Sequence, residues 1–424
     1  MSDILKIEGG HPLNGTVTIS GAKNATVALI PAAILALKGE INIFNVPDID
    51  DVESLTALLN YMNVKTESDE GGHIRIDVSG MNYMDLDHPA ATKLRASYYF
   101  MGALLGKYKK VRMKMPGGCY LGPRPIDLHL KGFEALGASV DFSGGWYNIT
   151  AEKLIGSKIY LDVASVGATI NIILAAVYAE GKTTIENAAK EPEIVDVANF
   201  LNKMGAKIRG AGTNVITVEG VDELVGTSHE IIPDRIEAGT YIIIAAAAAE
   251  KMTIENIIPQ HLEAMLSKLV EMGVKMDVGI DYVTVEGMQP MQAVDIQTLS
   301  YPGFATDLQQ PLTTLLTQAF GSSTVKETIY TERFKHCTEL MRMGANVQLS
   351  YAMASITGPT PLYGTDVVAT DLRCGASLVI AGLIASGVTA IHDVYHIDRG
   401  YDSLDEKLTR LGATIWREKE ETSH

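Results

Sequence analysis

Cysteine is scarce in this chain, and long apolar runs are absent. The three cysteines form no CxxC pattern, so the sequence predicts reduced thiols, no disulfide framework and no metal site. The longest apolar stretches, such as 241–249, fall well short of the roughly 20 residues that cross a bilayer and therefore indicate buried helices. The opening MSDILKIEGG lacks the basic start and apolar run of a secretion signal, so we expect a cytoplasmic protein.

Positive charge is also in short supply. The formal net charge is −16, with 35 Lys and Arg residues against 51 Asp and Glu residues. This balance argues against non-specific binding to nucleic acid or to an anionic membrane surface, since both need clustered cations. Anionic small substrates stay possible, because a few local Arg and Lys residues can bind them. With 424 residues, of which 46% are hydrophobic, two or three domains are expected.

What the sequence does contain is a repeat. Segments that look like a helix end followed by a strand recur roughly every 70 residues as LLNYMNVKT, FEALGASVDF, LNKMGAKIRG, LVEMGVKMDV, LMRMGANVQL and LTRLGATIW. The turn position is occupied in order by Asn63, Gly137, Gly205, Gly273, Gly344 and Gly412. Glycine, or here once asparagine, suits the left-handed conformation in which helices commonly end.

A second marker runs in step with the first, as LKGEINIFNV, LGKYKKVRMK, EGKTTIENAA, EKMTIENII, FGSSTVKETI and SGVTAIHDV. Alternating stretches such as 74–78, 215–218 and 282–285 have the period of half-buried strands. Long apolar stretches such as ATVALIPAAILAL have helix length and must be buried on most sides. We therefore expect α/β units with helices inside and sheets outside, clustered three plus three in two lobes.

One loop could carry chemistry. The segment MPGGCYLGPRP is rich in glycine and proline, which is typical of a loop, and it contains Cys119 with Arg112, Lys114 and Arg124 near it in sequence. These cations would favour the thiolate, although an ordinary loop cysteine fits the same pattern. Cys337 and Cys374 adjoin apolar stretches, which favours core filling.

Other candidates are single polar residues at the ends of repeat elements. Lys23 and Asn24 open an apolar helix whose amide end would attract an anion. Arg333 and Arg399 lie in turns after predicted strands, and Asp307 stands just before a helix. Each of them alone fits an ordinary surface residue better than a site residue, so they gain weight only as a set.

Together these segments resemble the UDP-N-acetylglucosamine enolpyruvyl transferases of bacterial cell-wall synthesis. The similarity covers essentially the whole chain, through GxxxLNGTVxISGAKNA, LRAS, GGCxLGxRPxDLH, SVGATIN, EPEIVDVANFLNKMG, PDRIEAGTY, YPGFATDLQ, ERFKH, ATDLRxGASLVIAGL and IDRGY. One departure is Ala164, where some members have lysine before the SVGAT segment, so one cationic contact to the nucleotide is missing or supplied by another residue.

The resemblance implies an inside-out α/β barrel with two lobes, each of three β-α-β-α-β-β units. One lobe is expected to span 23–230 and the other 1–22 plus 231–424, with the substrates bound in the cleft and the lobes closing on them. No cofactor is implied. The expected partners are phosphoenolpyruvate and UDP-N-acetylglucosamine, and a monomer is compatible with the family.

The implied reaction transfers the enolpyruvyl group of phosphoenolpyruvate to the 3'-hydroxyl of UDP-N-acetylglucosamine through a tetrahedral intermediate, the first committed step of peptidoglycan precursor synthesis. By resemblance Cys119 is the proton donor, the thiol that forms an adduct with phosphoenolpyruvate and the target of fosfomycin, and Asp307 is the base. Phosphoenolpyruvate is expected to contact Lys23, Asn24, Arg124 and Arg399. The nucleotide sugar is expected to contact Arg95, Arg124, Pro125, Ile126, Asp127, Leu128, Ser165, Val166, Gly167, Asp307 and Ile329. Further cleft positions are Arg235, Arg333, Asp371 and Arg373.

Two other interpretations compete with this one. The shikimate-pathway enolpyruvyl transferase shares the six-unit fold and the transferred group, but it lacks the GGCxLGxRP loop. A repeat scaffold without catalysis would use the same loop as a binding surface.

Overall fold

The repeated unit is a small sheet with two helices. In the computed structural model, which describes residues 3–115 and 126–419, one copy is continuous in sequence. It consists of β9 (Lys158–Tyr160), α6 (Val166–Ala176), β10 (Lys182–Glu186), α7 (Pro192–Met204), β11 (Lys207–Arg209) and β12 (Val215–Glu219). Strand β9 pairs parallel to β10, and β10, β12 and β11 pair antiparallel in that order. This is the predicted β-α-β-α-β-β unit.

Five more sheets in the described residues follow the same order. They are β13 (Ser228–Glu230), β3 (Glu40–Phe44), β5 (Ile74–Asp77) and β4 (Lys65–Ser68); β6 (Lys110–Lys114), β8 (Trp146–Thr150) and β7 (Ser139–Ser143); β2 (Leu13–Thr18), β14 (Ala249–Glu255), β16 (Tyr282–Glu286) and β15 (Lys275–Val278); β17 (Ile296–Gln297), β18 (Gly321–Lys326), β20 (Met353–Gly358) and β19 (Asn346–Ser350); and β21 (Asp366–Val368), β22 (Val388–His392), β1 (Asp3–Glu8) and β23 (Thr414–Lys419). In the sheet that contains β6, an isolated parallel bridge between Leu86 and Met113 takes the place of the first strand. Both ends of the described chain therefore lie in one sheet.

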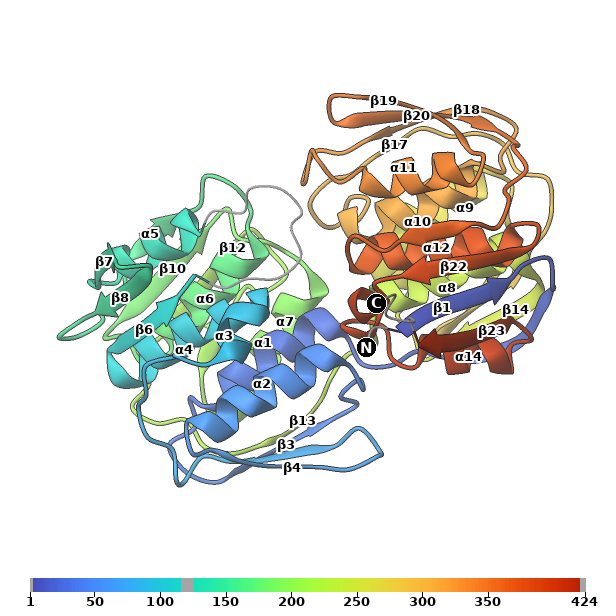
Figure 1. The fold of residues 1–424 in the computed structure, drawn as a ribbon. Helices are drawn as coiled ribbons and strands as arrows, with labels where there is room; N and C mark the ends of the chain where they lie inside the picture. Colours follow the sequence, from blue (N-terminus) through green and yellow to red (C-terminus); the bar gives the residue numbers. More distant parts are fainter. Residues whose placement is uncertain (1–2, 116–125, 420–424) are drawn as a thin grey trace. The chain divides into compact units, whose positions relative to one another are not determined.

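The copies group into two compact units (Figure 1). The middle unit comprises the described residues of 21–232, and the terminal unit comprises those of 1–20 and 233–424. Each unit contains three of the sheets and a hydrophobic core of its own. The chain passes from one unit to the other twice, after β2, which pairs with β14 of the terminal unit, and after β13, which pairs with β3 of the middle unit.

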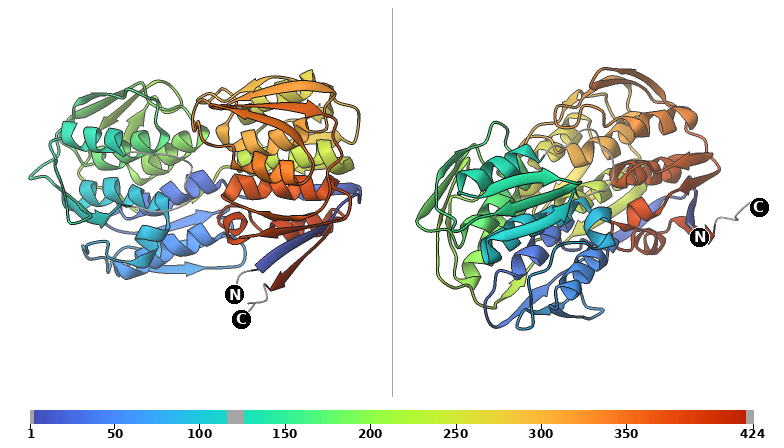
Figure 2. Two further views of the ribbon diagram at one scale, coloured as in Figure 1. Left: turned by 45° about the horizontal axis from the view of Figure 1, so that its top comes forward. Right: turned by 60° about the vertical axis from the view of Figure 1, so that its left-hand side comes forward.

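Buried helices fill the inside of each unit. Nearly every residue is buried in α1 (Lys23–Ala33), α4 (Tyr99–Tyr108), α6, α8 (Arg235–Ala248), α10 (Thr306–Leu316) and α12 (Leu372–Ile384). A second set has one buried face, namely α2 (Asp50–Tyr61), α5 (Asp127–Ala135), α7, α9 (Glu263–Glu271), α11 (Lys335–Arg342) and α14 (Leu404–Arg410). Short helical turns are α3 (Pro89–Lys93), η1 (Arg95–Tyr98), η2 (Pro259–Leu262) and α13 (Tyr395–Asp398). Within each unit the sheets lie outside the helices (Figures 1 and 2), as predicted.

The turn marker of the sequence has a direct structural cause. All six marker residues have a positive φ, from 61° to 113°, at Asn63, Gly137, Gly205, Gly273, Gly344 and Gly412. Each of them ends a helix of the second set and turns the chain into the next strand. Since residues with a Cβ rarely adopt this conformation, the repeat was visible in sequence as a spaced row of glycines.

No helix among residues 3–115 and 126–419 combines the length and the apolar character that a membrane span needs.

Candidate active site

Many of the predicted site residues share one structural position, the start of a buried helix. They lie at the first turns of these helices or directly before them, as Lys23 and Asn24 of α1, Arg95 of η1 ahead of α4, Ser165, Val166 and Gly167 of α6, Arg235 of α8, Asp307 of α10, and Asp371 and Arg373 of α12. In a β-α-β unit the helix begins where the preceding strand ends, at the edge where open α/β sheets bind ligands. The exposed amides of a helix start also favour anions.

The remaining predicted residues lie in connections after the second strand of a copy. Ile126, Asp127 and Leu128 open α5, Ile329 and Arg333 lie between β18 and α11, and Arg399 directly follows α13. Cys119, Arg124 and Pro125 lie outside the described residues. Both kinds of position follow the carboxyl ends of parallel strands.

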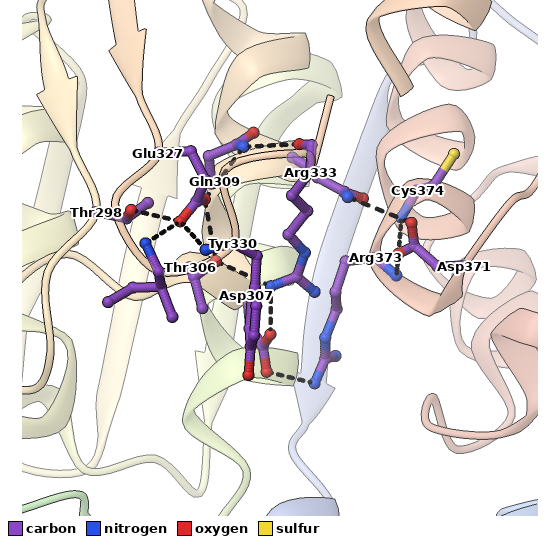
Figure 3. Close-up of polar contacts among 12 residues, drawn as sticks. Thr298, Thr306, Asp307, Gln309, Glu327, Tyr330, Arg333, Asp371, Arg373 and Cys374 are labelled. Carbon is purple, nitrogen blue, oxygen red and sulfur yellow. Dashed lines mark hydrogen bonds and ion pairs between the residues drawn. The ribbon is translucent and has the colours of Figure 1, made fainter. Parts of the chain in front are cut away.

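In the terminal unit, Asp307 bridges two arginines (Figure 3). Its Oδ1 accepts a hydrogen bond of 2.8 Å from Arg333 Nη1, and its Oδ2 accepts one of 3.4 Å from Arg373 Nη2. The arginine side chains are each 3% exposed, whereas the aspartate side chain is 25% exposed. The carboxylate is thus held by buried cations and still reaches the surface. Burial opposes the charged form of Arg333, but the carboxylates of Asp307 and Asp371 raise its pKa.

Asp371 sets the start of α12. Its Oδ1 accepts hydrogen bonds from the backbone N–H groups of Arg373 (2.9 Å) and Cys374 (3.0 Å), as an N-cap does. The Arg373 guanidinium lies 5.2 Å from the centre of the Tyr401 ring, and the Tyr401 hydroxyl is 2.9 Å from the hydroxyl of Thr240 on α8. The cap and these contacts fix the arginine that meets Asp307.

In the middle unit, Lys23 is held at the start of α1. Its Nζ lies 3.1 Å from Asp51 Oδ2, and the lysine side chain is 15% exposed. A cation is therefore fixed at a helix start, where it adds to the field of the backbone amides.

A buried histidine lies beside the start of α6. Asn171 Nδ2 lies 2.8 Å from His129 Nδ1, and because an amide NH₂ can only donate, Nδ1 is the acceptor and Nε2 carries the proton. Burial, and then the charge of Arg95, lower the pKa of His129 to about 3. A Cβ at Gly167 would lie 2.9 Å from both the Tyr98 hydroxyl and His129 Cε1. His129 therefore places a neutral N–H donor beside Gly167, where the structure leaves no room for a side chain. Sequence reasoning did not single out His129.

Glu327 is a second residue that sequence reasoning missed. It is 1% exposed and accepts hydrogen bonds from Thr298 and Thr306, which flank the Asp307 cluster (Figure 3). No motif signals it, because its partners are hydroxyl, amide and backbone groups from separate segments.

Comparisons with known proteins agree on one kind of enzyme. Residues 7–408 match the family model described as EPSP synthase (3-phosphoshikimate 1-carboxyvinyltransferase). The chain is 57% identical over 417 residues to UDP-N-acetylglucosamine 1-carboxyvinyltransferase 2 of Geobacillus kaustophilus (strain HTA426), covering 98% of this chain and 97% of the relative. It is also 57% identical over 416 residues to the protein of the same name from Bacillus subtilis (strain 168), covering 98% and 96%.

Solved structures show the same fold. The enolpyruvyl transferase NikO from Streptomyces tendae superposes with a TM-score of 0.89 at 27% identity, over 98% of this chain and 99% of that one. EPSP synthase from Acinetobacter baumannii superposes with a TM-score of 0.74 at 20% identity, over 99% and 100% of the two chains, which shows the fold alone.

Proposed function

This chain belongs to the UDP-N-acetylglucosamine 1-carboxyvinyltransferase family, and we propose that it transfers the enolpyruvyl group of phosphoenolpyruvate to the 3'-hydroxyl of UDP-N-acetylglucosamine with release of phosphate. The observation that carries the proposal is 57% identity to enzymes of that name across 98% of this chain. The reaction is the first committed step of peptidoglycan precursor synthesis.

Addition to the enol ether needs an acid and a base. A proton must reach the methylene carbon while the attacking hydroxyl loses one. We assign the base to Asp307, because its carboxylate is partly exposed and is oriented by Arg333 and Arg373. The two guanidiniums stabilise the ionised carboxylate, which is the form that can take a proton. The acid is assigned to Cys119 on its loop motif, and phosphate then leaves the tetrahedral intermediate.

Phosphoenolpyruvate carries a phosphate and a carboxylate, so it needs several cations. We assign these cations to Lys23, Arg124 and Arg399, and a further contact to Asn24. The position of Lys23 at the start of a buried helix supports this role, because its ammonium and the helix amides attract the same anion.

The nucleotide sugar is assigned to the starts of α5 and α6 together with Arg95 and Ile329. The Ser165 hydroxyl caps α6 by accepting from Ala168 N at 3.2 Å, and the diphosphate can use the helix amides that remain. This arrangement compensates for Ala164, because helix amides and Arg95 supply positive potential where some relatives have a lysine.

We also propose that the middle and terminal units are the two lobes of the family fold, and that the enzyme works in the cytoplasm. The cytoplasm is where phosphoenolpyruvate and nucleotide sugars are made.

The decisive experiment measures phosphate release from phosphoenolpyruvate with each acceptor in turn. We expect release with UDP-N-acetylglucosamine and none with shikimate 3-phosphate, the acceptor that the name of the matching family model suggests. Release with shikimate 3-phosphate alone would reverse the assignment. No release with either acceptor would favour a scaffold without catalysis.

A further inference from the structure

The residue that follows the second strand has a recurring structural task in three of the six copies. In three copies it is an asparagine with a φ between 56° and 60°. Its Nδ2 donates to the backbone oxygen of the residue that follows the first strand, and the pairs are Asn45 with Ile231 (2.9 Å), Asn187 with Leu161 (2.7 Å) and Asn256 with Ile19 (2.9 Å). The asparagine therefore ties the edge strand to its neighbour.

In the copy built on β17 and β18, this position is Glu327. The backbone N–H of Thr298 donates to Lys326 O, which places Thr298 opposite Glu327 in register, as Ile231 lies opposite Asn45. A glutamate cannot donate to a carbonyl, and the Thr328 hydroxyl donates to Thr298 O in its place. The carboxylate of Glu327 therefore does not hold the backbone oxygen of the edge strand.

That carboxylate is instead buried among donors. It accepts five hydrogen bonds, from Thr298 Oγ1 (2.6 Å), Thr306 Oγ1 (3.0 Å), Gln309 Nε2 (3.3 Å), Ile329 N (2.9 Å) and Tyr330 N (3.1 Å). A buried carboxylate is tolerated only when donors surround it. These donors come from three segments, namely the end of β17, the first turn of α10 and the turn after β18 (Figure 3).

The contacts lead directly to Asp307. Thr306 has one hydroxyl proton, and an ionised Glu327 can only accept it. The lone pairs of Thr306 Oγ1 are then left for Arg333 Nη1, which donates to it at 3.0 Å. The same Nη1 donates to Asp307 Oδ1. Glu327 thus fixes the direction of the threonine hydroxyl, and the hydroxyl fixes the guanidinium against the carboxylate.

A second route reaches the same arginine. Gln309 Nε2 donates both to Glu327 Oε2 and to the backbone oxygen of Arg333, at 3.3 and 3.0 Å. Both groups that meet Nε2, a carboxylate oxygen and a backbone carbonyl oxygen, can only accept, which fixes the orientation of the amide. The Glu327 carboxylate therefore positions both the side chain and the backbone of Arg333.

We propose that Glu327 is a positioning residue for enolpyruvyl transfer. It holds Arg333 against the base Asp307, and it binds the backbone of the turn that presents Ile329 to the nucleotide sugar. The inference rests on the proposed function, since the roles of Asp307 and Ile329 come from it. Glu327 touches no reacting group and acts through these neighbours.

Glu327→Gln tests the proposal, because it keeps the size of the side chain but turns an NH₂ group toward donors. We expect kcat for phosphate release to fall at least about tenfold, since small displacements of a base are costly. We expect KM for UDP-N-acetylglucosamine to rise about three- to tenfold, as binding contacts of the turn weaken. KM for phosphoenolpyruvate should stay within about twofold, because its assigned contacts lie elsewhere.

Glu339→Gln is the matched control. Glu339 is also a buried carboxylate of the terminal unit, and it accepts from Val368 N at 3.0 Å and Arg342 Nη1 at 3.2 Å. Loss of these contacts should lower stability, with kcat per folded enzyme and both KM values within about twofold of the wild type. Equal kinetic changes in the two variants would mean that Glu327 is only structural.

A double-mutant comparison tests the route. If Glu327 acts through Asp307, adding Glu327→Gln to Asp307→Ala should not lower kcat further. Full additivity would overturn this route, as would a Glu327→Gln enzyme with wild-type constants. If Glu327→Gln does not fold, Thr306→Val should show the same loss of kcat and Thr306→Ser should restore it, and an unchanged kcat in Thr306→Val would overturn the proposal. Absence of phosphate release in the wild-type enzyme would instead refute the proposed function.

Discussion

Removal of the Asp307 carboxylate should affect stability as well as catalysis. The carboxylate is the shared partner of Arg333 and Arg373, at 2.8 and 3.4 Å, and both guanidiniums are buried. In Asp307→Ala the two positively charged guanidiniums would stay buried without their carboxylate partner. Breaking a buried ion pair from one side costs about 3–5 kcal/mol.

Two features of the structure lower the expected free-energy cost of removing the Asp307 carboxylate. The carboxylate is 25% exposed, so solvent screens part of its interaction. Arg333 keeps its bond to Thr306, and Arg373 keeps its contact with Tyr401. We therefore expect Asp307→Ala to destabilise the terminal unit by about 2–3 kcal/mol. Asp307→Asn retains an acceptor oxygen and should cost less, about 1–2 kcal/mol.

Urea unfolding followed by circular dichroism measures the loss, with the transition of each unit fitted separately because the units have separate cores. Adding Arg373→Met to Asp307→Ala removes one unpaired cation and should recover about 1 kcal/mol. In the kinetic assay both Asp307 variants should lose about 10²- to 10⁴-fold in kcat, with a smaller change in affinity for the nucleotide sugar. A stability of Asp307→Ala within about 0.5 kcal/mol of the wild type, or no recovery in the double variant, would refute the ion-pair reasoning.

Four further predictions concern the cysteines, the buried histidine and the glycine at α6. Cys119→Ala should abolish turnover while Cys119→Asp retains some, because a carboxylic acid can still donate a proton; full activity of the alanine variant would exclude the acid role. A thiol-alkylating reagent or fosfomycin should label Cys119 in the native protein but not Cys337 or Cys374, as peptide mass spectrometry of the labelled protein can show. Cys337 and Cys374 are fully buried, and burial raises the pKa of both thiols, that of Cys374 to about 12. Because burial lowers the pKa of His129 from 6.5 to about 3, stability should be lost as pH falls through this window, by about 1 kcal/mol between pH 6 and 5, and urea unfolding should show a smaller loss in His129→Asn. A Cβ at Gly167 would lie 2.9 Å from the His129 ring, so Gly167→Ala should raise KM for UDP-N-acetylglucosamine about tenfold and leave KM for phosphoenolpyruvate nearly unchanged; equal shifts in both would contradict the assignment.

The sequence by itself determined the repeated architecture. Helix ends that need a left-handed residue leave glycine, or at Asn63 asparagine, at fixed spacing, and apolar stretches without a polar face can only be buried helices. Both are local properties of the chain, so the six copies and the arrangement of helices inside sheets could be predicted without coordinates. The similarity of whole segments to known relatives also singled out Asp307, Arg333 and Arg373 by position.

What only the tertiary structure decided is how such residues meet. Arg333 and Arg373 are separated from Asp307 by 26 and 66 residues in the chain, and only the packing of α10 against α12 and the turn after β18 brings them to one carboxylate. Glu327 illustrates the limit more sharply. In sequence it is a glutamate after a strand, where three other copies have asparagine, and no pattern shows that its neighbours in space are donors from three segments. The burial of Glu327 and its hydrogen-bond network depend on long-range packing, which local periodicity in the sequence does not reveal.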